Sequence, residues 1–427
     1  MDIDYNALPE IILCALGFFL MYFLLYKRYI YSILDPLFIY YVFTLSFSSV
    51  LVINVLNGDV ADLIHFFLCH VFFFLGFYIV MNFFKKYICY TNFSISINDF
   101  FDYKVLKVTL YCLFGIYFIA NTILFYTTGF PLLSDDPTVA KVENFVEGFG
   151  IILLINIGLG NFVLTTLLFF ALLERKKIFF LLLLVVIILT ALEGSKAGLI
   201  RILITFLLLV NHRFFSDKNI TKKFKWITPL GLLLVLGVAL IVLSKGSVDT
   251  DQTIFAFVRR LLYGADSILY FYLPVNQQYF DKFHFWEYIP YFFDQILGFL
   301  RIVTPKEALG NVMVMNAFPM MVGTIVGPNT AYYIEGQIFF GYFGAFLYSM
   351  IVGAVYAFIR EYYFKANYYS AFWFVLICCI FQQASALTNE VTFFVSQVFY
   401  TLFFVVPVYL LVNLIIHGKI RFYKLHY

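Results

Sequence analysis

Residues 326–344 read VGPNTAYYIEGQIFFGYFG, and they join two stretches of very different character. The stretch before them, 245–332, has sparse charges separated by aromatic residues; it is too polar to cross a membrane and too apolar to be disordered. The stretch 333–358 is long and apolar enough to cross a bilayer as a helix, which takes about 20 residues. We therefore expect a folded cap on the membrane surface that leads into a membrane helix.

The overall composition agrees with a membrane protein. Of the 427 residues, 63% are hydrophobic and 12% are charged, whereas charged residues make up about 25% of an average soluble domain. The chain contains 57 Phe and 33 Tyr, more aromatic surface than a soluble core could bury, so much of it is expected to face lipid. The net charge of +3 is too small to indicate a nucleic-acid partner.

We predict an all-α polytopic protein with about 11 transmembrane helices, because a bilayer core of ~30 Å needs about 20 apolar residues per helix. The predicted spans are 9–26, 32–56, 62–84, 105–126, 149–173, 178–193, 197–212, 226–244, 333–358, 368–388 and 391–415. The pair 178–193 and 197–212 forms either a tight hairpin or a re-entrant pair. The acidic start, without a cleavage site, predicts that the first span is retained.

The distribution of Lys and Arg predicts the orientation. With the N-terminus outside and the C-terminus inside, every cytoplasmic loop carries basic residues, as the positive-inside rule requires. Segment 245–332 is then a large helical extracytoplasmic loop, which we expect to cap the active site of one integral membrane domain spanning 1–427. The basic residues left outside are the informative ones, namely Lys141, Lys196, Arg201, Lys245, Arg259, Arg260, Lys282, Arg301 and Lys306.

Cysteine and histidine positions predict neither a disulfide framework nor a bound metal. Five of the six Cys lie in predicted spans, and no CxxC pair occurs. His65 and His70 are five residues apart in the third span, which is not the spacing of a helical metal pair.

The segment LEGSKAGLIR, residues 192–201, places Glu193, Lys196 and Arg201 at or just below the outer surface. A charge at membrane depth costs about 2.5–3.5 kcal/mol, so Arg201 is expected to have a partner. Lys196 and the N-terminus of helix 197–212 could together bind an anion such as a phosphate. The alternative is an internal ion pair of Glu193 with Lys196 or Arg201, without a ligand.

In the large loop, Arg259 and Arg260 precede Asp266. On a helix Arg259 and Asp266 share one face, and a fixed carboxylate near a cation suits a general base. The alternative is an amphipathic helix at the interface with snorkelling arginines. Arg301 and Lys306 lie in a predicted turn with Thr304–Pro305. They are either anion contacts or interfacial cations near lipid headgroups.

Glu335 lies at the predicted outward end of a span and is the second base candidate. The alternative is a structural role, in which its charge complements the helix dipole. Asn329 could cap the same helix, and Asn329 and Tyr333 are candidate substrate contacts. His284, in DKFHFWEYIP, is either a packing residue or a further substrate contact.

Together these motifs resemble the Wzy-type polymerases of bacterial O-antigen and capsule repeat units. The resemblance rests on GSKAGL at 194–199, on Arg259 and Arg260 ahead of Gly264 and Asp266, and on GPN and EG at 327–329 and 335–336. It covers the whole chain, since the family combines many membrane helices with one large extracytoplasmic loop in the second half.

The resemblance implies a metal-independent glycosyltransferase of the bacterial inner membrane that needs no cofactor. Its donor and acceptor would both be polyprenyl-pyrophosphate-linked oligosaccharides, and the growing glycan would pass to the terminal sugar of a new repeat. Cations would stabilise the pyrophosphate leaving group and a carboxylate would accept the hydroxyl proton. A chain-length regulator and a flippase are implied as partners.

The resemblance also gives roles to particular residues. Arg301 and one of the adjacent pair Arg259 and Arg260 correspond to family arginines of the outer loops. Lys196 and Arg201 would be membrane-edge pyrophosphate contacts, so we expect these five cations to line one cavity.

Two other functions remain open. An O-antigen ligase shares this layout and carries a histidine in the large loop, a position that His284 could fill. A transporter or flippase of lipid-linked oligosaccharide would place charges deep in several spans.

Overall fold

The structure, a computed structural model, describes residues 8–30, 35–41, 44, 51–52, 60–87, 100–134, 150–193, 196–216, 266–321 and 328–418. Within these ranges the chain forms helices and no strand. The longer helices before the large loop are α1 (Leu8–Tyr26), α3 (Val60–Tyr87), α4 (Tyr103–Thr128), α6 (Gly150–Glu174), α7 (Lys177–Leu192) and α8 (Lys196–Asn211). Short turns of helix are η3 (Pro131–Leu133) and α9 (Arg213–Ser216).

The described part of the large loop consists of short helices, and long helices follow it. The loop contains α13 (Asp266–Phe271), α14 (Pro274–Phe280), α15 (Phe285–Phe299), α16 (Leu309–Ala317) and η5 (Pro319–Met321). The chain then continues through α17 (Tyr332–Lys365), α18 (Ala371–Gln383), η6 (Ala384–Thr388) and α19 (Val391–His417).

Six helices of the described residues are long and apolar enough to cross a membrane: α3, α4, α6, α17, α18 continued by η6, and α19. Shorter apolar segments lie in α1, α7 and α8. The expectation of an all-helical, multi-pass chain is confirmed to this extent, whereas the larger number of spans and the orientation stay predictions. Predicted span 226–244 lies outside the described residues, and span 32–56 is described only in part.

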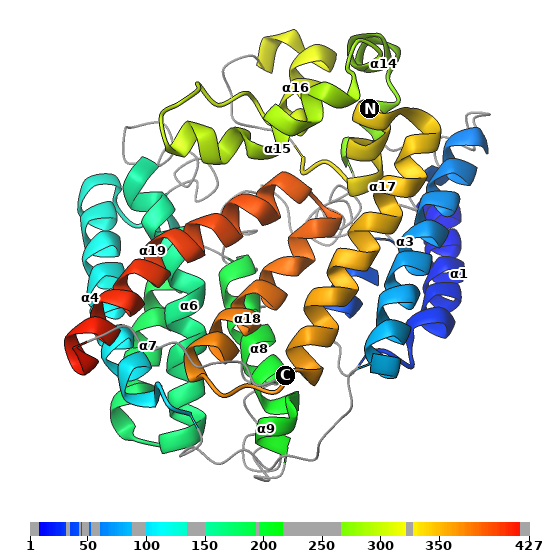
Figure 1. Cartoon of the computed structure of the whole chain (residues 1–427). Coiled ribbons are helices and arrows are strands. Elements are labelled where there is room, and N and C mark those ends of the chain that lie inside the picture. The colour runs from blue at the N-terminus through cyan, green and yellow to red at the C-terminus, as the bar shows by residue number, and fades with distance from the viewer. Residues whose placement is uncertain are drawn as a thin grey trace. The chain divides into compact units, whose positions relative to one another are not determined.

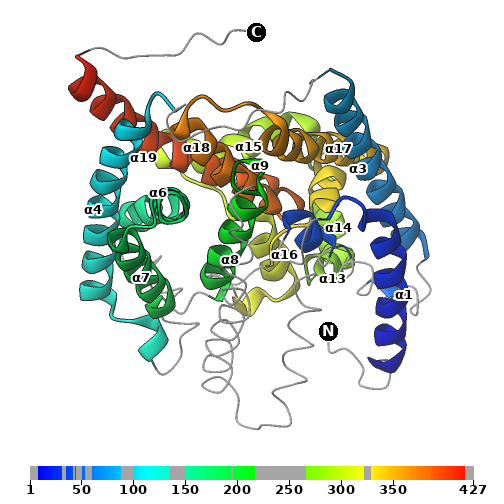
Figure 2. The ribbon, with the colours of Figure 1, turned by 90° about the horizontal axis from the view of Figure 1, so that it is seen from below.

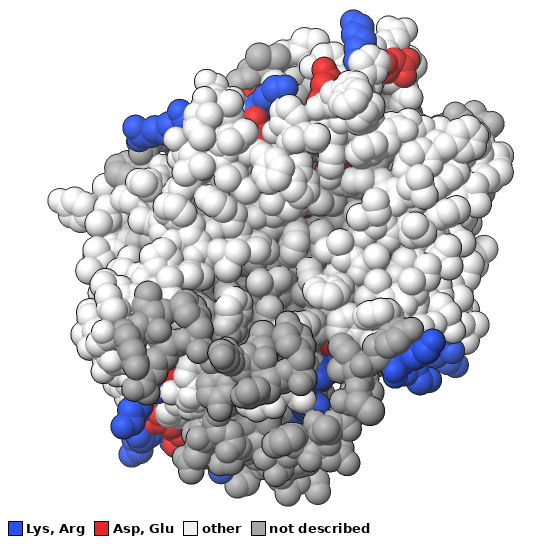
Figure 3. All heavy atoms as spheres, in the orientation of Figure 1, with Lys and Arg blue, Asp and Glu red and all other residues white. Residues whose placement is uncertain are grey.

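The surface carries the charge pattern of a membrane-embedded protein. In α3 no charged residue occurs between Asp62 and Lys85, and many of its Leu, Ile, Val and Phe side chains are exposed. In Figure 3 the visible surface over α1, α3 and α17 is white between the charged residues of the loop helices above it and a group of Lys and Arg at its lower edge. An apolar band between charged ends suits contact with lipid.

The chain divides into two compact units. Unit 1 comprises Met1–Cys89, Asp251–Tyr362 and Gln383–Ser396, and unit 2 comprises Tyr90–Thr250, Tyr363–Gln382 and Gln397–Tyr427.

In unit 2, α4, α6, α7 and α8 pack as neighbours (Figures 1 and 2). The buried Asp102 fixes the start of α18: its carboxylate accepts hydrogen bonds from the backbone N–H groups of Ala371 (2.8 Å) and Phe372 (3.2 Å). The hydroxyl of Ser370 (2.5 Å) and that of Tyr409 (2.9 Å) donate to the same carboxylate. The orphan donors of the helix N-terminus are thus satisfied by one charged cap.

In unit 1, α3 packs closely against α17, and the two lie side by side in Figures 1 and 2. A Cβ on Gly76 would lie 2.0 Å from the Met350 carbonyl oxygen, and one on Gly353 would lie 2.0 Å from that of Phe73. Only glycine permits so close an approach of two helix backbones, the usual device by which membrane helices associate.

The helix α17 is broken at Gly341, where φ is 72° and ψ is −179°. Two contacts indicate that the chain reverses there: the Tyr348 hydroxyl lies 3.0 Å from Glu335 Oε1, and the rings of Phe340 and Tyr348 stack with centroids 5.5 Å apart. A straight helix would separate residues 335 and 348 by about 20 Å. We call residues 332–340 the short arm and residues 342–365 the long arm.

The break corrects the expectation of one continuous helix over 333–358. The short arm packs antiparallel against the long arm, because Gly336 contacts Tyr348 and Gly344 contacts Phe340. Since Tyr348 comes seven residues after Gly341, Glu335 lies about 10 Å along the long arm from the reversal.

The loop helices are held together by Asn276 and fixed to the segment before the short arm. Asn276 Nδ2 donates to the Tyr270 carbonyl (2.8 Å) and to the Met313 carbonyl (2.9 Å), which ties α14 to α13 and α16. Gly310 lies against Pro328, where a Cβ would be 1.7 Å from the carbonyl oxygen. The described part of the predicted cap is therefore folded and helical.

Candidate functional site

The strongest candidate site is built around Glu335 in the short arm. Its side chain is 0% exposed. The Tyr348 hydroxyl of the long arm donates to Oε1 (3.0 Å), and the backbone N–H of Val391, the first residue of α19, donates to Oε2 (3.2 Å). Both oxygens thus accept a hydrogen bond, and the N-terminus of α19 stabilises negative charge at this place.

A second tyrosine extends the site to the large loop. The hydroxyl of Tyr288 in α15 lies 2.8 Å from that of Tyr348. Tyr288 is half-buried, and its ring packs on Phe339 and Phe340 of the short arm. The loop helix α15 and the two arms of α17 therefore meet at one chain of polar groups.

A second carboxyl, that of Glu390, lies close enough to Glu335 for the two charges to repel. Glu390 directly precedes α19, and its Oε1 accepts a hydrogen bond from the Thr392 hydroxyl (3.3 Å). Burial raises the pKa of Glu390 above its ordinary value of 4.5. Burial likewise raises the pKa of Tyr291 in α15, which the charges of Glu335 and Glu390 raise further. A low-dielectric site with two carboxyls can hold and release a proton.

Two of the predicted cations of the loop, Arg301 and Lys306, lie in one exposed turn. Arg301 follows α15 with a positive φ of 57°, and its side chain is exposed. The side chain of Lys306 is also exposed, while its backbone N–H donates to Asp294 Oδ2 (2.8 Å). The predicted turn is therefore present. Because the Arg301 side chain is exposed, its guanidinium can be solvated.

Three further predicted residues lie on the loop or the short arm. His284 is exposed directly before α15, where its backbone N–H donates to Glu287 Oε2 (3.4 Å). Asn329 is exposed; Ala331, rather than Asn329, directly precedes the short arm and accepts its first backbone hydrogen bonds. Tyr333 is fully buried, with its ring against Phe66 of α3.

The remaining predicted residues are described less completely. Asp266 begins α13, but its side chain lies outside the described residues, as do Arg259 and Arg260 entirely. Lys196 begins α8, with its side chain likewise outside. The common cavity expected for the five cations stays a prediction.

In unit 2, Arg201 interacts electrostatically with Glu193 and Tyr117. This agrees with the alternative in which Glu193 serves as an internal partner of Arg201. The Arg201 carbonyl accepts hydrogen bonds from Thr205 and from Gln382 of α18.

Sequence reasoning missed Tyr288, Tyr348 and Glu390. Nothing in the pattern distinguishes two of 33 tyrosines; their pairing depends on the reversal at Gly341. Glu390 could have been found, because it is the single acidic residue between the predicted spans 368–388 and 391–415.

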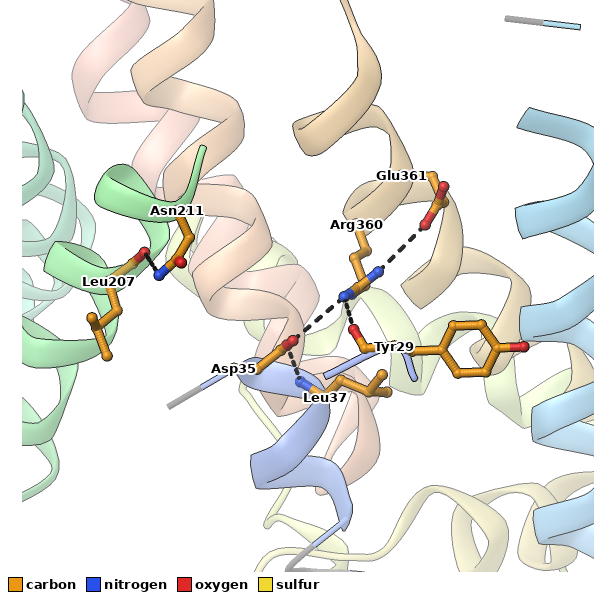
Figure 4. Close-up of polar contacts among 7 residues, drawn as sticks. All are labelled: Tyr29, Asp35, Leu37, Leu207, Asn211, Arg360 and Glu361. Atoms are coloured by element: carbon orange, nitrogen blue, oxygen red, sulfur yellow. Dashed lines mark hydrogen bonds and ion pairs between the residues drawn. The ribbon is translucent and has the colours of Figure 1, made fainter. Parts of the chain in front are cut away.

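A second buried polar cluster lies at the other end of the long arm (Figure 4). Arg360 is 8% exposed and pairs with Asp35 (3.4 Å) and Glu361 (3.4 Å), and it donates to the Tyr29 carbonyl. Asp35 Oδ1 also accepts the backbone N–H of Leu37 (2.8 Å). The cluster ties the chain between α1 and α3 to α17, and its one cation offsets part of the charge of two carboxylates.

The two histidines of α3 hold neighbouring elements. His65 Nε2 lies 2.9 Å from the Tyr342 carbonyl, next to the break in α17. His70 lies between the hydroxyls of Tyr26 (3.3 Å) and Tyr40 (2.9 Å). In the part of the chain that the structure describes, no group of three His, Cys, Asp or Glu residues could hold a metal ion.

Comparison with models of protein families, with curated proteins and with solved structures gives no match to this chain.

Proposed function

We propose that the chain polymerises lipid-linked oligosaccharide repeat units at the outer face of the bacterial inner membrane. It transfers the growing glycan from polyprenyl pyrophosphate to the terminal sugar hydroxyl of another lipid-linked repeat. The observation that carries the proposal is the carboxyl of Glu335, held by hydrogen bonds where the large loop meets a broken apolar helix.

Two requirements of the reaction motivate this assignment. The donor and acceptor lipids stay in the membrane while their sugars lie above it, so the chemistry belongs where apolar helices meet a folded loop. Proton removal from a sugar hydroxyl needs a positioned base, and the departing pyrophosphate needs cations. The loop offers Arg301 and Lys306 as exposed cations. Arg259, Arg260, Lys196 and Arg201 are further candidates, and Asp266 is the alternative base.

The test is the glycan ladder of cells that lack the gene, complemented with the wild type or with Glu335→Gln. We expect the deletion to produce a single capped repeat, the wild type to restore the ladder, and the variant to reach the membrane without restoring it. Asp281→Asn, an exposed carboxyl after α14, is the matched control and should restore the ladder. An intact ladder in the deletion would refute a polymerase.

A transporter of lipid-linked oligosaccharide is the second candidate. The buried Asp35, Arg360 and Glu361 favour it, because ionisable groups among membrane helices often mark transport pathways. The same experiment separates the candidates, since loss of transport or of ligation would remove even the single capped repeat.

A further inference from the structure

The carboxyl of Glu335 cannot touch a sugar hydroxyl directly in this structure. It has no exposed surface, and its two oxygens are occupied by Tyr348 and by the backbone of Val391. Tyr348 is itself 6% exposed. The next hydroxyl in the series belongs to Tyr288 on the loop helix α15, which is half-buried and is the most exposed of the three side chains.

With Glu335 ionised, the hydrogen-bond directions follow from the number of protons that each group carries. A phenol has one proton to donate, and the proton of Tyr348 goes to Glu335 Oε1. In the 2.8 Å contact between the two phenols, Tyr288 is therefore the donor. The oxygen of Tyr288 still has lone pairs that can accept a hydrogen bond from a further hydroxyl.

We propose that Tyr288 meets the hydroxyl of the acceptor sugar and passes its proton, through Tyr348, to Glu335. This inference rests on the proposed function and deepens it: Tyr288 is the catalytic residue, and Tyr348 and Glu335 are positioning residues that act through it.

The step balances in protons and electrons. The acceptor O–H gives its proton to the Tyr288 oxygen, Tyr288 gives its own to Tyr348, and Tyr348 gives its own to Glu335 Oε1. The acceptor oxygen forms a bond to the anomeric carbon of the donor glycan. The bond between that carbon and the phosphate oxygen breaks, and its electron pair leaves with the polyprenyl pyrophosphate. Glu335 later returns the proton to water along the same hydroxyls.

Two neighbours of Glu335 favour the proton transfer, one by stabilising the carboxylate before it and one by repelling the carboxylate charge that the transfer removes. Before transfer, the N-terminus of α19 stabilises the ionised carboxylate through the Val391 N–H. After transfer, the loss of charge relieves its repulsion with Glu390.

The experiment measures chain extension by purified protein added to membranes of the deletion cells, which contain the lipid-linked repeat. Tyr288→Phe keeps the ring packing and removes the hydroxyl, so extension should fall about 10²–10⁴-fold, the usual contribution of general-base catalysis. The control is Tyr279→Phe on α14, an exposed tyrosine of the same loop, which should extend chains at the wild-type rate.

Two further readouts distinguish a role in proton transfer from a purely structural role of these residues. The wild-type rate should rise with pH as Glu335 ionises, whereas Glu335→Gln should be slow and lack that rise. Because the residues act in series, Tyr288→Phe combined with Glu335→Gln should be no slower than the slower single variant. If the rate of the double variant falls by the product of the two single fold-losses, the relay is wrong.

Failure of this inference and failure of the proposed function give different results. If the wild type extends chains and Tyr288→Phe matches it, the relay is wrong and the polymerase assignment stands. If the wild type does not extend chains at all, both are wrong.

Discussion

Gly341 is the residue on which the candidate site depends, because it alone permits the reversal between the two arms. Its φ of 72° with ψ near 180° is a conformation that only glycine adopts readily, although a Cβ there would meet no neighbouring atom within 4 Å. A side chain at this position would therefore destabilise the fold through backbone strain and not through clashes with neighbouring atoms.

We expect Gly341→Ala to lower the free energy of unfolding by about 1–3 kcal/mol. Gly115 in α4 is the matched control, since a Cβ there also meets nothing, but its backbone is helical. Gly115→Ala should leave stability unchanged or raise it by about 0.5–1 kcal/mol. Thermal unfolding of both variants in detergent measures the difference, and equal shifts would contradict the reversal.

Glu390 makes stability depend on pH. Burial raises its pKa in the folded state, so the folded state binds the proton more tightly than the unfolded one. The protonated carboxyl contributes stability below the unfolded pKa, and this contribution is lost as pH rises through the folded pKa.

The neutral isostere Glu390→Gln should remove this loss. We subtract the melting temperature of wild type from that of the variant at each pH. This difference should be larger at pH 8 than at pH 5. The exposed Asp281 after α14 provides the control, and Asp281→Asn should not show this increase. A variant profile parallel to wild type would indicate that Glu390 is ionised in the fold at both pH values.

At the level of elements, α15 has an apolar outward face. Phe285, Trp286, Ile289 and Phe293 are all exposed, Trp286 by 69%. They recur at helical spacing, opposite the buried Tyr291 and Asp294. Exposure of so much apolar surface to water is unfavourable, so we expect α15 to lie in the membrane interface.

Fluorescence of Trp286 tests this placement in liposomes. The chain has three Trp, and replacing Trp226 and Trp373 by Phe leaves Trp286 as the reporter. Quenchers attached near the lipid headgroup should reduce its emission more than aqueous iodide does. Stronger quenching by iodide would place α15 in water.

The sequence predicts which segments are helical better than it predicts where a helix breaks and the chain reverses. Apolar segments of sufficient length mark the membrane helices, whereas the individual loop helices α14, α15 and α16 are not predicted. The reversal at Gly341 is hidden, because QIFFGYFGAF continues the apolar run and glycine is common in membrane helices. Glu335 could be chosen as a candidate because it lies at the predicted end of a span. Its partner Tyr348, thirteen residues away, could not be chosen, because only the hidden reversal brings the two together.

At the scale of the whole molecule, the predicted orientation in the membrane can be tested by labelling. The distribution of Lys and Arg predicts that Lys282 of the loop faces outward and Lys85 at the end of α3 faces the cytoplasm. Both side chains are exposed. In a chain whose native Cys are replaced, Lys282→Cys should react with an impermeant maleimide on intact spheroplasts, and Lys85→Cys only after lysis. The reverse result would invert the topology and place the proposed chemistry on the wrong side.

The broken helix also has a consequence for synthesis of the chain. The short arm, at about 14 Å, cannot cross a ~30 Å bilayer core by itself, so the insertion machinery has no complete span to recognise there. Val391, which binds the carboxyl of Glu335, leaves the ribosome 56 residues later. The candidate site is thus assembled only after α19 has been made, and a nascent chain truncated before α19 would present Glu335 without its backbone partner to the quality-control proteases of the membrane.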